Sequence, residues 1–383
     1  MKIVYLYTAL TTIGGADRIV TQKMNYLAEN LGHDVYVITD TQRGRTPIFP
    51  LSTKVTHIDV AVDFGSQYVH QLPFRFIYYQ ILMKKYKIKI NEYLNKIKPD
   101  IVISTLGRDM DFLTSLTDGS KKIGESHIAK PYMRNFHLME AKGGIYKYIA
   151  KYWRRKQEKA IRKLDAFVVL THEDAQSWNE VRKSIVIPNM MTIETDIVSS
   201  CKGKTIISVG RYSEQKGYDL LIESWKIVAQ KHPDWCINIY GEGELKDSLQ
   251  QQINTANLQQ QIKLCQPVTN ITKKYLESTF YVMSSRFEGF GLVLMEAMNC
   301  GLPCVSFDCP YGPSGIIRHQ EDGLLVDNGN IHALAESICY MIENQEKRIE
   351  MGKKAKENIQ RYSRGSIMAQ WESLFQSLVN QQQ

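Results

Sequence analysis

Residues 279–301 read TFYVMSSRFEGFGLVLMEAMNCG, and this stretch decides the fold that the sequence predicts. Its first part, Thr279–Ser284, is an apolar run with the length of a buried strand. Its last part, Leu292–Asn299, has the composition of a buried helix, and a glycine-containing loop joins the two parts. A buried strand that enters a helix through a tight loop is the repeating unit of parallel α/β sheets.

The same unit recurs on both sides of that stretch, because short apolar runs alternate with helical patterns that begin near Ala16 and near Phe76. In the first half the strand-like runs are Lys2–Tyr7, Asp34–Thr39, Ile101–Ser104, Lys122–Glu125 and Ala166–Leu170. In the second half they are Thr205–Val209, Cys236–Tyr240, Gln261–Leu264, Thr279–Ser284, Pro303–Phe307 and Gly323–Val326. A polar segment, 190–204, separates the two sets and is interpreted as a linker with a hinge.

We therefore predict an α/β protein with two Rossmann-like, doubly wound parallel-sheet domains that face each other across a cleft. The 383 residues suffice for two domains, since single cores stop growing near ~250–300 residues. The predicted parts are a first domain at 1–190, a second at 191–362 and a closing helix at 363–383. Ligands of such sheets bind beyond the carboxyl ends of the strands, so the loops at those ends are the candidate sites.

The composition is that of a folded globular protein, with 43% hydrophobic and 23% charged residues. No run of ~18 apolar residues is present, which predicts that the chain does not span a membrane. The first residues do not resemble a signal peptide, and seven cysteines at irregular spacing are typical of a reduced cytoplasmic protein. Cys300, Cys304, Cys309 and His319 lack the paired spacing of a zinc site.

Charge is distributed unevenly, because residues 1–190 hold 29 Lys and Arg against 18 Asp and Glu, while the remainder holds 19 against 22. A basic first half predicts that this domain meets an anionic surface or ligand. Two stretches combine basic with aromatic residues, GGIYKYIAKYWRRKQEKAIRKLDAF at 143–167 and LPFRFIYYQILMKKYKIKI at 72–90. Such a stretch is either a helix that lies on an anionic membrane or a solvated cationic helix whose aromatic residues are in the core. The presence of two such stretches favours peripheral membrane binding. No RNA-binding motif accompanies the charge, so no nucleic-acid partner is expected.

Two loops of the second half carry the groups that an anion needs. After the strand-like run Thr205–Val209 the chain reads GRYSEQKG, which places Arg211 and Lys216 at a strand's carboxyl end. Two fixed cations there suit a diphosphate whose charge grows as it leaves. The following turn, YGEGE, offers Gly241 and Gly243, which either bring the backbone close to a base or phosphate or simply form the turn.

The opening stretch contains two glutamates, Glu288 and Glu296. On one continuous helix eight residues of rise separate them by about 12 Å, which exceeds the roughly 5–10 Å of a glycosidase carboxylate pair. Two acids that hold different parts of one long ligand are the better interpretation. Gly289 and Gly291 between them let backbone N–H groups approach an anion. This arrangement indicates a nucleotide-sugar site, and the alternative is two surface glutamates beside a simple turn.

Four sequence motifs, in their order along the chain, resemble those of the retaining glycosyltransferases of family four, which have the GT-B fold. They are GR-x4-KG-x-D (210–219), Gly-Glu-Gly, E-x7-E and GLPCVSFDCPYGPSGIIRHQEDGLLV (301–326). The resemblance implies that Arg211 and Lys216 clamp the donor diphosphate. It also implies that Glu288 contacts the transferred sugar and that Glu296 binds the ribose hydroxyls. Further donor or sugar contacts are implied at Gly241, Gly243, Gly289, Phe290, Gly291, Leu292, Gly312, Ser314 and Gly315.

The resemblance extends to the first half, which would be the acceptor-binding domain. In TTIGGADRIV (11–20), Gly14 and Gly15 look like the family's N-terminal glycine loop, which faces the diphosphate. In GESHIAK (124–130), Glu125 and His127 are similar to a Ser-Glu-His-type segment whose histidine contacts the sugar. Without the resemblance these are a common turn and an ordinary loop histidine. In members of the family a terminal helix crosses back onto the first domain. The resemblance therefore implies that the helix at 363–383 contacts the first domain.

Two departures from the family are visible. Gly315 stands where many relatives have an acid, which predicts sugar recognition by backbone N–H groups. The segment Leu264–Val268 lacks a glycine that is usual at that turn, which weakens the prediction of uridine as the base.

The family's chemistry implies transfer of a hexose or N-acetylhexosamine from a nucleotide-diphosphate sugar, such as a UDP-sugar, to a saccharide acceptor with retained configuration. A lipid-linked saccharide of a bacterial surface glycan would suit the basic domain. No protein nucleophile, cofactor or metal is expected. Asp109-Met-Asp111 is the competing signal, since a DxD motif holds a divalent metal in glycosyltransferases of a different fold. The rival functions are a sugar-nucleotide epimerase and a catalytically silent nucleotide-sugar-binding protein.

Overall fold

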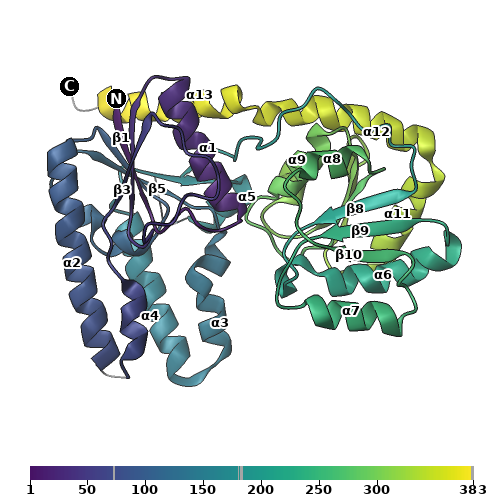
Figure 1. The fold of residues 1–383 in the computed structure, drawn as a ribbon, viewed down its shortest axis with the longest axis horizontal. Helices are drawn as coiled ribbons and strands as arrows, with labels where there is room; N and C mark the ends of the chain where they lie inside the picture. The colour runs from purple at the N-terminus through teal and green to yellow at the C-terminus, as the bar shows by residue number, and fades with distance from the viewer. Residues whose placement is uncertain (72–73, 180, 182–183, 381–383) are drawn as a thin grey trace. The chain divides into compact units, whose positions relative to one another are not determined.

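The computed structural model describes residues 1–71, 74–179, 181 and 184–380. The chain divides into two compact units, the first made of Met1–Pro188 with Gly365–Gln383 and the second of Asn189–Arg364. Each unit has one parallel sheet flanked by helices, as Figure 1 shows. This confirms the predicted α/β class with two parallel-sheet domains.

The sheet of the first unit has the strand order β3-β2-β1-β4-β5-β6-β7, with parallel pairing throughout its described register. Its strands are β1 (Lys2–Tyr7), β2 (Asp34–Thr39), β3 (Val55–Asp59), β4 (Ile101–Ser104), β5 (Lys121–Glu125), β6 (Ala166–Val169) and β7 (Ser184–Val186). β1 lies between β2 and β4, so the order reverses there, and the loops that follow these strands share one edge of the sheet. β3 and β7 were not predicted, because edge strands need not be apolar throughout.

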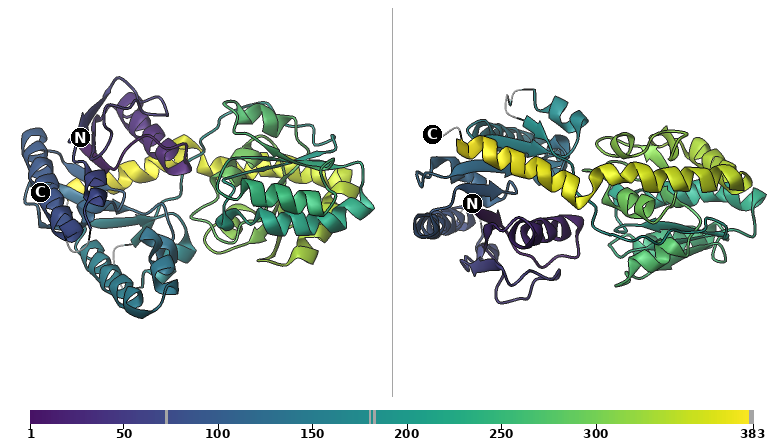
Figure 2. Two further views of the ribbon diagram at one scale, coloured as in Figure 1. Left: turned by 60° about the horizontal axis from the view of Figure 1, so that its bottom comes forward. Right: turned by 90° about the horizontal axis from the view of Figure 1, so that it is seen from above.

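Helices flank the sheet of the first unit, and a long helix near the C-terminal end of the chain also belongs to it. They are α1 (Gly15–Glu29), η1 (Phe64–Val69), α2 (Phe74–Ile97), η2 (Arg108–Asp111), η3 (Leu113–Ser115), η4 (Lys130–Asn135), α3 (Phe136–Ala141), α4 (Gly144–Ile161), α5 (His172–Ser177) and α13 (Arg364–Asn380). Leu72 and Pro73, which belong to one predicted basic stretch, lie outside the described residues. In Figure 1 and in the right view of Figure 2, α13 lies beside α1, and its side chains Trp371 and Phe375 are buried.

The second sheet repeats the plan with the order β10-β9-β8-β11-β12-β13. Its strands are β8 (Thr205–Val209), β9 (Cys236–Tyr240), β10 (Ile262–Cys265), β11 (Tyr281–Met283), β12 (Cys304–Asp308) and β13 (Gly323–Asp327). The helices are η5 (Glu214–Lys216), α6 (Tyr218–Lys231), α7 (Lys246–Thr255), α8 (Ile271–Leu276), α9 (Leu292–Asn299), α10 (Pro313–Ile316), α11 (Ile331–Glu343), α12 (Gln345–Asn358) and η6 (Ile359–Tyr362). The order reverses between β8 and β11, so the loops after these two strands adjoin at the sheet's carboxyl edge.

The segment 190–204 was interpreted as a polar linker, and for its first part this was wrong. Met190, Met191 and Ile193 are buried, and the Asn299 side-chain amide donates to the Ile193 carbonyl at 2.7 Å. Cys201 is buried as well. Apolar residues at these positions attach the segment to the second unit, although polar residues dominate its composition.

Among the helices that the structure describes, none is at once long enough and apolar enough to cross a bilayer.

Candidate functional site

The loops after β8 and β11 bring Lys216 and Glu288 together. The Lys216 ammonium lies 2.6 Å from Glu288 Oε1, and the Ser285 hydroxyl donates to the same oxygen at 2.7 Å. The side chain of Glu288 is 7% exposed and that of Lys216 is 17% exposed. Two groups that were predicted to contact the donor therefore form a nearly buried ion pair at the carboxyl edge of the second sheet.

A second ion pair holds the two loops in register. The Arg286 guanidinium donates to both carboxylate oxygens of Asp219, at 2.8 and 2.6 Å, and to the Glu214 carbonyl at 2.9 Å. Hydrogen bonds from Arg286 hold the pKa of the Asp219 carboxyl below its usual value, so this side chain stays ionised. The Ser284 hydroxyl adds a bond to the Lys216 carbonyl at 3.0 Å. The role of Arg286 was not predicted. The sequence does place this cation two residues before Glu288 and the acid Asp219 three residues after Lys216, and these positions could have indicated the pair.

Gly217 is required between Lys216 and α6. Its φ of 59° lies in the left-handed region, and a Cβ atom there would lie 2.1 Å from the Ser284 carbonyl oxygen. No side chain fits against a backbone atom at that distance. The glycine therefore lets the loop after β8 contact the loop after β11 directly, which places the ammonium of Lys216 beside Glu288.

Gly241 and Gly243, the predicted donor-binding turn, serve the packing of neighbouring loops. A Cβ atom on Gly241 would lie 1.9 Å from the Gly210 carbonyl oxygen, and one on Gly243 would lie 2.4 Å from the Tyr212 carbonyl oxygen. The Gly241 N–H donates to the Cys265 carbonyl at 3.0 Å and is therefore already occupied. Both glycines thus permit this close packing, and their contact with the donor stays a prediction.

Arg211 lies on the same loop as Lys216 and is exposed. Its guanidinium forms no hydrogen bond or ion pair with any residue in the described ranges. The loop thus carries one cation that is paired with Glu288 and one that faces solvent. An unpaired guanidinium on the same loop as a paired ammonium suits an incoming polyanion.

Glu296 lies in the middle of α9 and is held by two hydroxyl groups. The Thr192 hydroxyl donates to Oε1 at 2.6 Å and the Tyr275 hydroxyl to Oε2 at 3.1 Å. Burial and the Glu296 carboxylate raise the pKa of Tyr275, so its hydroxyl keeps the proton that it donates. The contact of Glu296 with ribose hydroxyls stays a prediction.

The loop before α9 and the loop after β12 lie against each other. Gly291 has a φ of 100° and begins α9, while Phe290 is buried and packs edge-on against Tyr362 at 5.7 Å between ring centroids. A Cβ atom on Gly312 would lie 2.7 Å from the Phe290 carbonyl oxygen. The Phe290 side chain is thus a core residue, whereas the predicted contact residues Ser314 and Gly315 are exposed and Gly289 and Leu292 are half-buried.

In the first unit, the end of β5 holds a cluster of buried charges. Glu125 Oε1 lies 2.6 Å from the Lys23 ammonium and 3.3 Å from His127 Nε2. The two predicted residues therefore adjoin. Lys23 was not predicted, because a lysine within an amphipathic helix normally indicates a solvated face.

The predicted glycine loop is anchored by an acid in α1. Asp17 accepts the Tyr7 hydroxyl at 2.6 Å and the Thr12 backbone N–H at 2.8 Å. Gly14 is the N-cap residue and Gly15 the first residue of α1. A Cβ atom on Gly14 would have only the Thr12 methyl within 4 Å, at 3.8 Å, so space alone does not demand glycine there.

The two acids of the DxD motif contact different parts of the first unit. Asp109 is buried, and burial raises its pKa to about 6. Asp111 instead pairs with Lys156 at 3.1 Å and with Arg134 at 3.7 Å. Within the described ranges, no group of three or more His, Cys, Asp and Glu side chains is placed to hold a metal ion.

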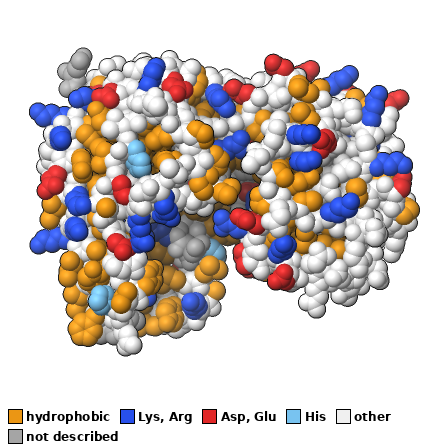
Figure 3. Space-filling view, in the orientation of Figure 1, with side chains coloured by type: hydrophobic (Ala, Val, Ile, Leu, Met, Phe, Trp, Pro, Cys, Tyr) orange, Lys and Arg blue, Asp and Glu red, His pale blue; other side chains and the backbone are white. Residues whose placement is uncertain are grey.

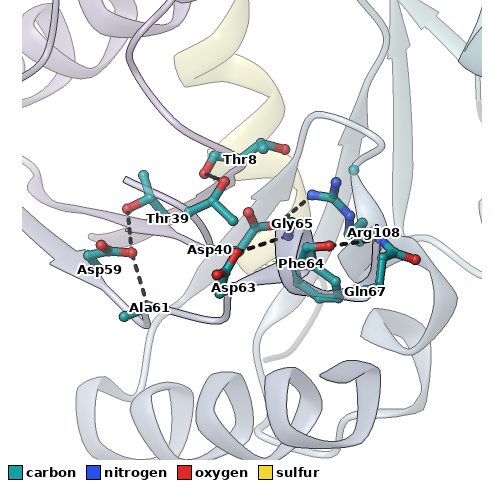
Figure 4. A network of polar contacts seen from close by, with 12 residues as sticks. Thr8, Thr39, Asp40, Asp59, Ala61, Asp63, Phe64, Gly65, Gln67 and Arg108 are labelled. Atoms are coloured by element: carbon teal, nitrogen blue, oxygen red, sulfur yellow. Dashed lines mark hydrogen bonds and ion pairs between the residues drawn. The ribbon is translucent and has the colours of Figure 1, made fainter. Parts of the chain in front are cut away.

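A further polar network lies beyond the carboxyl ends of β2, β3 and β4, as Figure 4 shows. Arg108 donates to Asp40 at 3.2 Å, and its guanidinium lies 4.5 Å from the centre of the Phe64 ring. Asp63 accepts the Gly65 N–H at 2.9 Å and also pairs with Arg43. These contacts order the loops at that edge of the first sheet.

Comparison with known proteins supports the interpretation of the second unit. Residues 193–358 match the family described as glycosyl transferases group 1. The matched range contains the loops after β8, β9, β11 and β12, with both Lys216 and Glu288.

Individual relatives cover different shares of the chain. An uncharacterized glycosyltransferase of Haemophilus influenzae is 26% identical over 382 residues, which is 97% of this chain and 99% of that protein. A poly(ribitol-phosphate) alpha-N-acetylglucosaminyltransferase of Staphylococcus aureus is 34% identical over 232 residues, or 58% of this chain. The match spans 47% of that longer protein, so less than half of its length is represented here.

Among solved structures, a mutant of S. aureus TarM in complex with Fondaparinux, alpha-GlcNAc-glycerol and UDP resembles the whole chain. The TM-score is 0.76 at 18% identity, over 98% of this chain and 99% of that one. This likeness shows the fold, which is the predicted GT-B fold.

Proposed function

We propose that the protein transfers a hexose or N-acetylhexosamine from a nucleotide-diphosphate sugar to a saccharide acceptor, with retention of the anomeric configuration. The proposal starts from the family, because the chain carries a group 1 domain and is a glycosyltransferase of the kind that acts in bacterial glycan biosynthesis. The observation that carries the proposal is the Lys216–Glu288 pair, 2.6 Å apart at the switch point of the second sheet. A cation beside an acid suits a ligand that is anionic at one end and hydroxylated at the other.

The proposed mechanism follows from these groups. Arg211 and Lys216 neutralise the charge that grows on the departing diphosphate. Glu288 Oε1 already accepts from Lys216 and Ser285, and Oε2 accepts from no described residue, which leaves Oε2 for a sugar hydroxyl. Alignment of the acceptor hydroxyl on the face that the diphosphate leaves then replaces a protein nucleophile.

A UDP-sugar is the proposed donor. The TarM complex supports it because that structure contains UDP together with a GlcNAc-bearing compound. Metal-independent, cofactor-free transfer is part of the proposal, because cations and N–H groups of the chain supply the charge stabilisation that a metal would otherwise provide.

The test is a screen of purified full-length protein against nucleotide-sugars and saccharide acceptors, with products identified by mass spectrometry. We expect transfer from at least one UDP-hexose or UDP-N-acetylhexosamine in the presence of EDTA, and an anomeric proton coupling that shows retention. An inverted product would contradict the mechanism, and activity that needs Mn²⁺ would contradict metal independence. Donor conversion without an acceptor would identify an epimerase, and binding without turnover would identify a silent binding protein.

The acceptor is proposed to be lipid-linked, because one end of the first unit is both apolar and basic. Exposed apolar side chains gather on η1, on the start of α2 and on α3 and α4, in the lower left part of Figure 3. They are Tyr68, Val69, Phe74, Phe76, Ile77, Ile81, Leu138, Ile145, Tyr146, Tyr148, Ile149 and Tyr152, here called the apolar end. Exposed Lys84, Lys85, Lys147 and Lys151 lie on the same helices, so anionic headgroups are complementary to it. We therefore propose that the enzyme binds peripherally to the inner face of a cell membrane.

Membrane binding has a direct test on vesicles. Ile145→Ala with Tyr148→Ala removes two side chains of the apolar end that are 70% and 73% exposed, so stability should not change. Each loses apolar area that would enter the bilayer, and we expect sedimentation with phosphatidylglycerol vesicles to weaken by about tenfold. The matched control is Tyr340→Ala, an exposed tyrosine of α11 in the second unit, which should bind as the wild type does. Equal binding of the double variant and the wild type would refute the membrane proposal.

A further inference from the structure

The ion pair between Lys23 and Glu125 is one of the most buried features of the first unit. Both side chains are 2% exposed, and the ammonium and carboxylate lie 2.6 Å apart. A buried ion pair is costly unless its remaining polar atoms find partners. Lys23 finds one in the ring of Trp371 from α13, whose centroid lies 3.5 Å from the ammonium.

Glu125 is shared between this lysine and a residue of the proposed sugar site. Its Oε1 lies 2.6 Å from the Lys23 ammonium and 3.3 Å from His127 Nε2. Its Oε2 is buried and accepts no hydrogen bond from the described residues. The imidazole lies at contact distance from the carboxylate but without hydrogen-bond alignment. The carboxylate therefore lies between the ammonium of Lys23 and the imidazole of His127.

The charges in this cluster favour a carboxylate beside a neutral imidazole. Burial alone would raise the pKa of Glu125, but the Lys23 charge and hydrogen bond, with a contribution from His127, outweigh it and lower this pKa. Burial lowers the pKa of His127, and the charge of Lys23 adds to this, against the opposite effects of Glu125 and Asp17. The charged groups that face the imidazole thus come from β5 and from α1.

Resting on the proposed contact of His127 with the sugar, we propose that Lys23 and Trp371 are positioning residues, which neutralise and fix Glu125 so that it orients His127 as a neutral imidazole. A neutral ring can exchange a hydrogen bond with a sugar hydroxyl. It also avoids repelling the positive charge that develops on the sugar in an oxocarbenium-like transition state. In this arrangement α13 is part of the sugar site and not only a structural attachment.

The test follows the ring titration of His127 by NMR in the full-length protein without donor. The chain has nine histidines, so the His127 signal is assigned by its absence in a His127→Gln spectrum. In Lys23→Met the carboxylate keeps only His127 as a counter-ion, and the midpoint should rise by about one pH unit or more. In Glu125→Gln the midpoint should fall. An ion pair that does not act on the imidazole predicts no movement of the His127 midpoint in a folded variant, so opposite shifts in the two variants show that it does act.

The double variant Lys23→Met/Glu125→Gln guards against misfolding, because it leaves no buried charge unpaired. Because it lacks both the Glu125 and the Lys23 charge, its His127 midpoint should lie between those of Glu125→Gln and Lys23→Met. Trp371→Leu should raise the His127 midpoint in the same direction as Lys23→Met, whereas Leu378→Ala, two turns further along α13, should leave it unchanged. A His127 midpoint that stays in place or falls in folded Lys23→Met overturns the proposal.

Activity measurements separate this proposal from the proposed function. If the titrations shift as expected, the acidic limb of the kcat/KM profile should move with them in Lys23→Met. Shifted titrations together with unchanged transfer by His127→Gln would leave the positioning network in place and refute the role of His127 in transfer. Unmoved titrations in an active enzyme would refute the positioning proposal alone.

Discussion

Lys216→Ala should lower kcat/KM for sugar transfer by about two to three orders of magnitude, the usual loss when one donor to a developing anion is removed. The Lys216 ammonium lies 2.6 Å from Glu288 Oε1, at the carboxyl edge of the second sheet, where the donor diphosphate is proposed to bind. Its removal takes away the fixed cation that is proposed to neutralise the departing diphosphate. It also leaves a carboxylate that is 7% exposed with only the Ser285 hydroxyl on Oε1, so the melting temperature should be measured alongside.

The controls for this prediction come from the same unit. Lys226→Ala removes a surface lysine that pairs with Glu223 on α6 and should leave kcat/KM unchanged. Lys216→Arg keeps the charge with a different shape and should recover part of the loss. Assays are run well below the melting temperature of each variant. Near-normal transfer by a folded Lys216→Ala protein would show that the diphosphate is held elsewhere.

Gly217→Ala should destabilise the second unit and displace Lys216 together. The residue has a φ of 59°, and the new methyl group would lie 2.1 Å from the Ser284 carbonyl oxygen. The left-handed conformation and the clash each cost roughly 1–3 kcal/mol. Since a domain of this size loses about 2–4 °C per kcal/mol, the melting temperature should fall by at least about 5 °C. Activity should fall as well, because the loop that carries Lys216 must move.

A second glycine isolates the effect of the clash. Gly329 has a φ of 80° and no atom within 4 Å of the position of a Cβ atom. Gly329→Ala therefore introduces the backbone strain without the collision and should cost only about 1–2 kcal/mol. The comparison uses thermal unfolding followed by circular dichroism. Equal losses in the two variants would show that the close approach to Ser284 does not matter.

The strands at the centre of each sheet were predictable because they are continuous apolar runs. β1, β2, β4, β8 and β9 were predicted with the bounds that the structure has, and α9 was too. The edge strands β3 and β7 were missed, since Val55–Asp59 alternates with polar residues and Ser184–Val186 is very short. The first part of the segment 190–204 was interpreted as a linker because most of its residues are polar. Its few apolar residues, such as Met190, are buried, and composition does not show this.

The site was predictable where it depends on which loops follow which strands. Lys216 and Glu288 follow β8 and β11, and the general rule for parallel sheets places such loops together at the switch point. The Arg286–Asp219 pair and the Lys23–Trp371 contact were not predictable, because they depend on side-chain packing between distant segments. Sequence patterns report which face of an element is apolar, and they do not report which charged side chains meet inside the protein.

The assignment of residues 365–383 to the first unit has a consequence for biosynthesis. Domains usually fold in order as they leave the ribosome, the earlier one first. Here the nascent first unit lacks Trp371 over Lys23 until residue 371 has been synthesised, whereas the second unit, Asn189–Arg364, is already fully translated by then. The first unit is therefore completed after the second, although its synthesis starts earlier, and loss of residues 365–380 should affect the first unit more than the second.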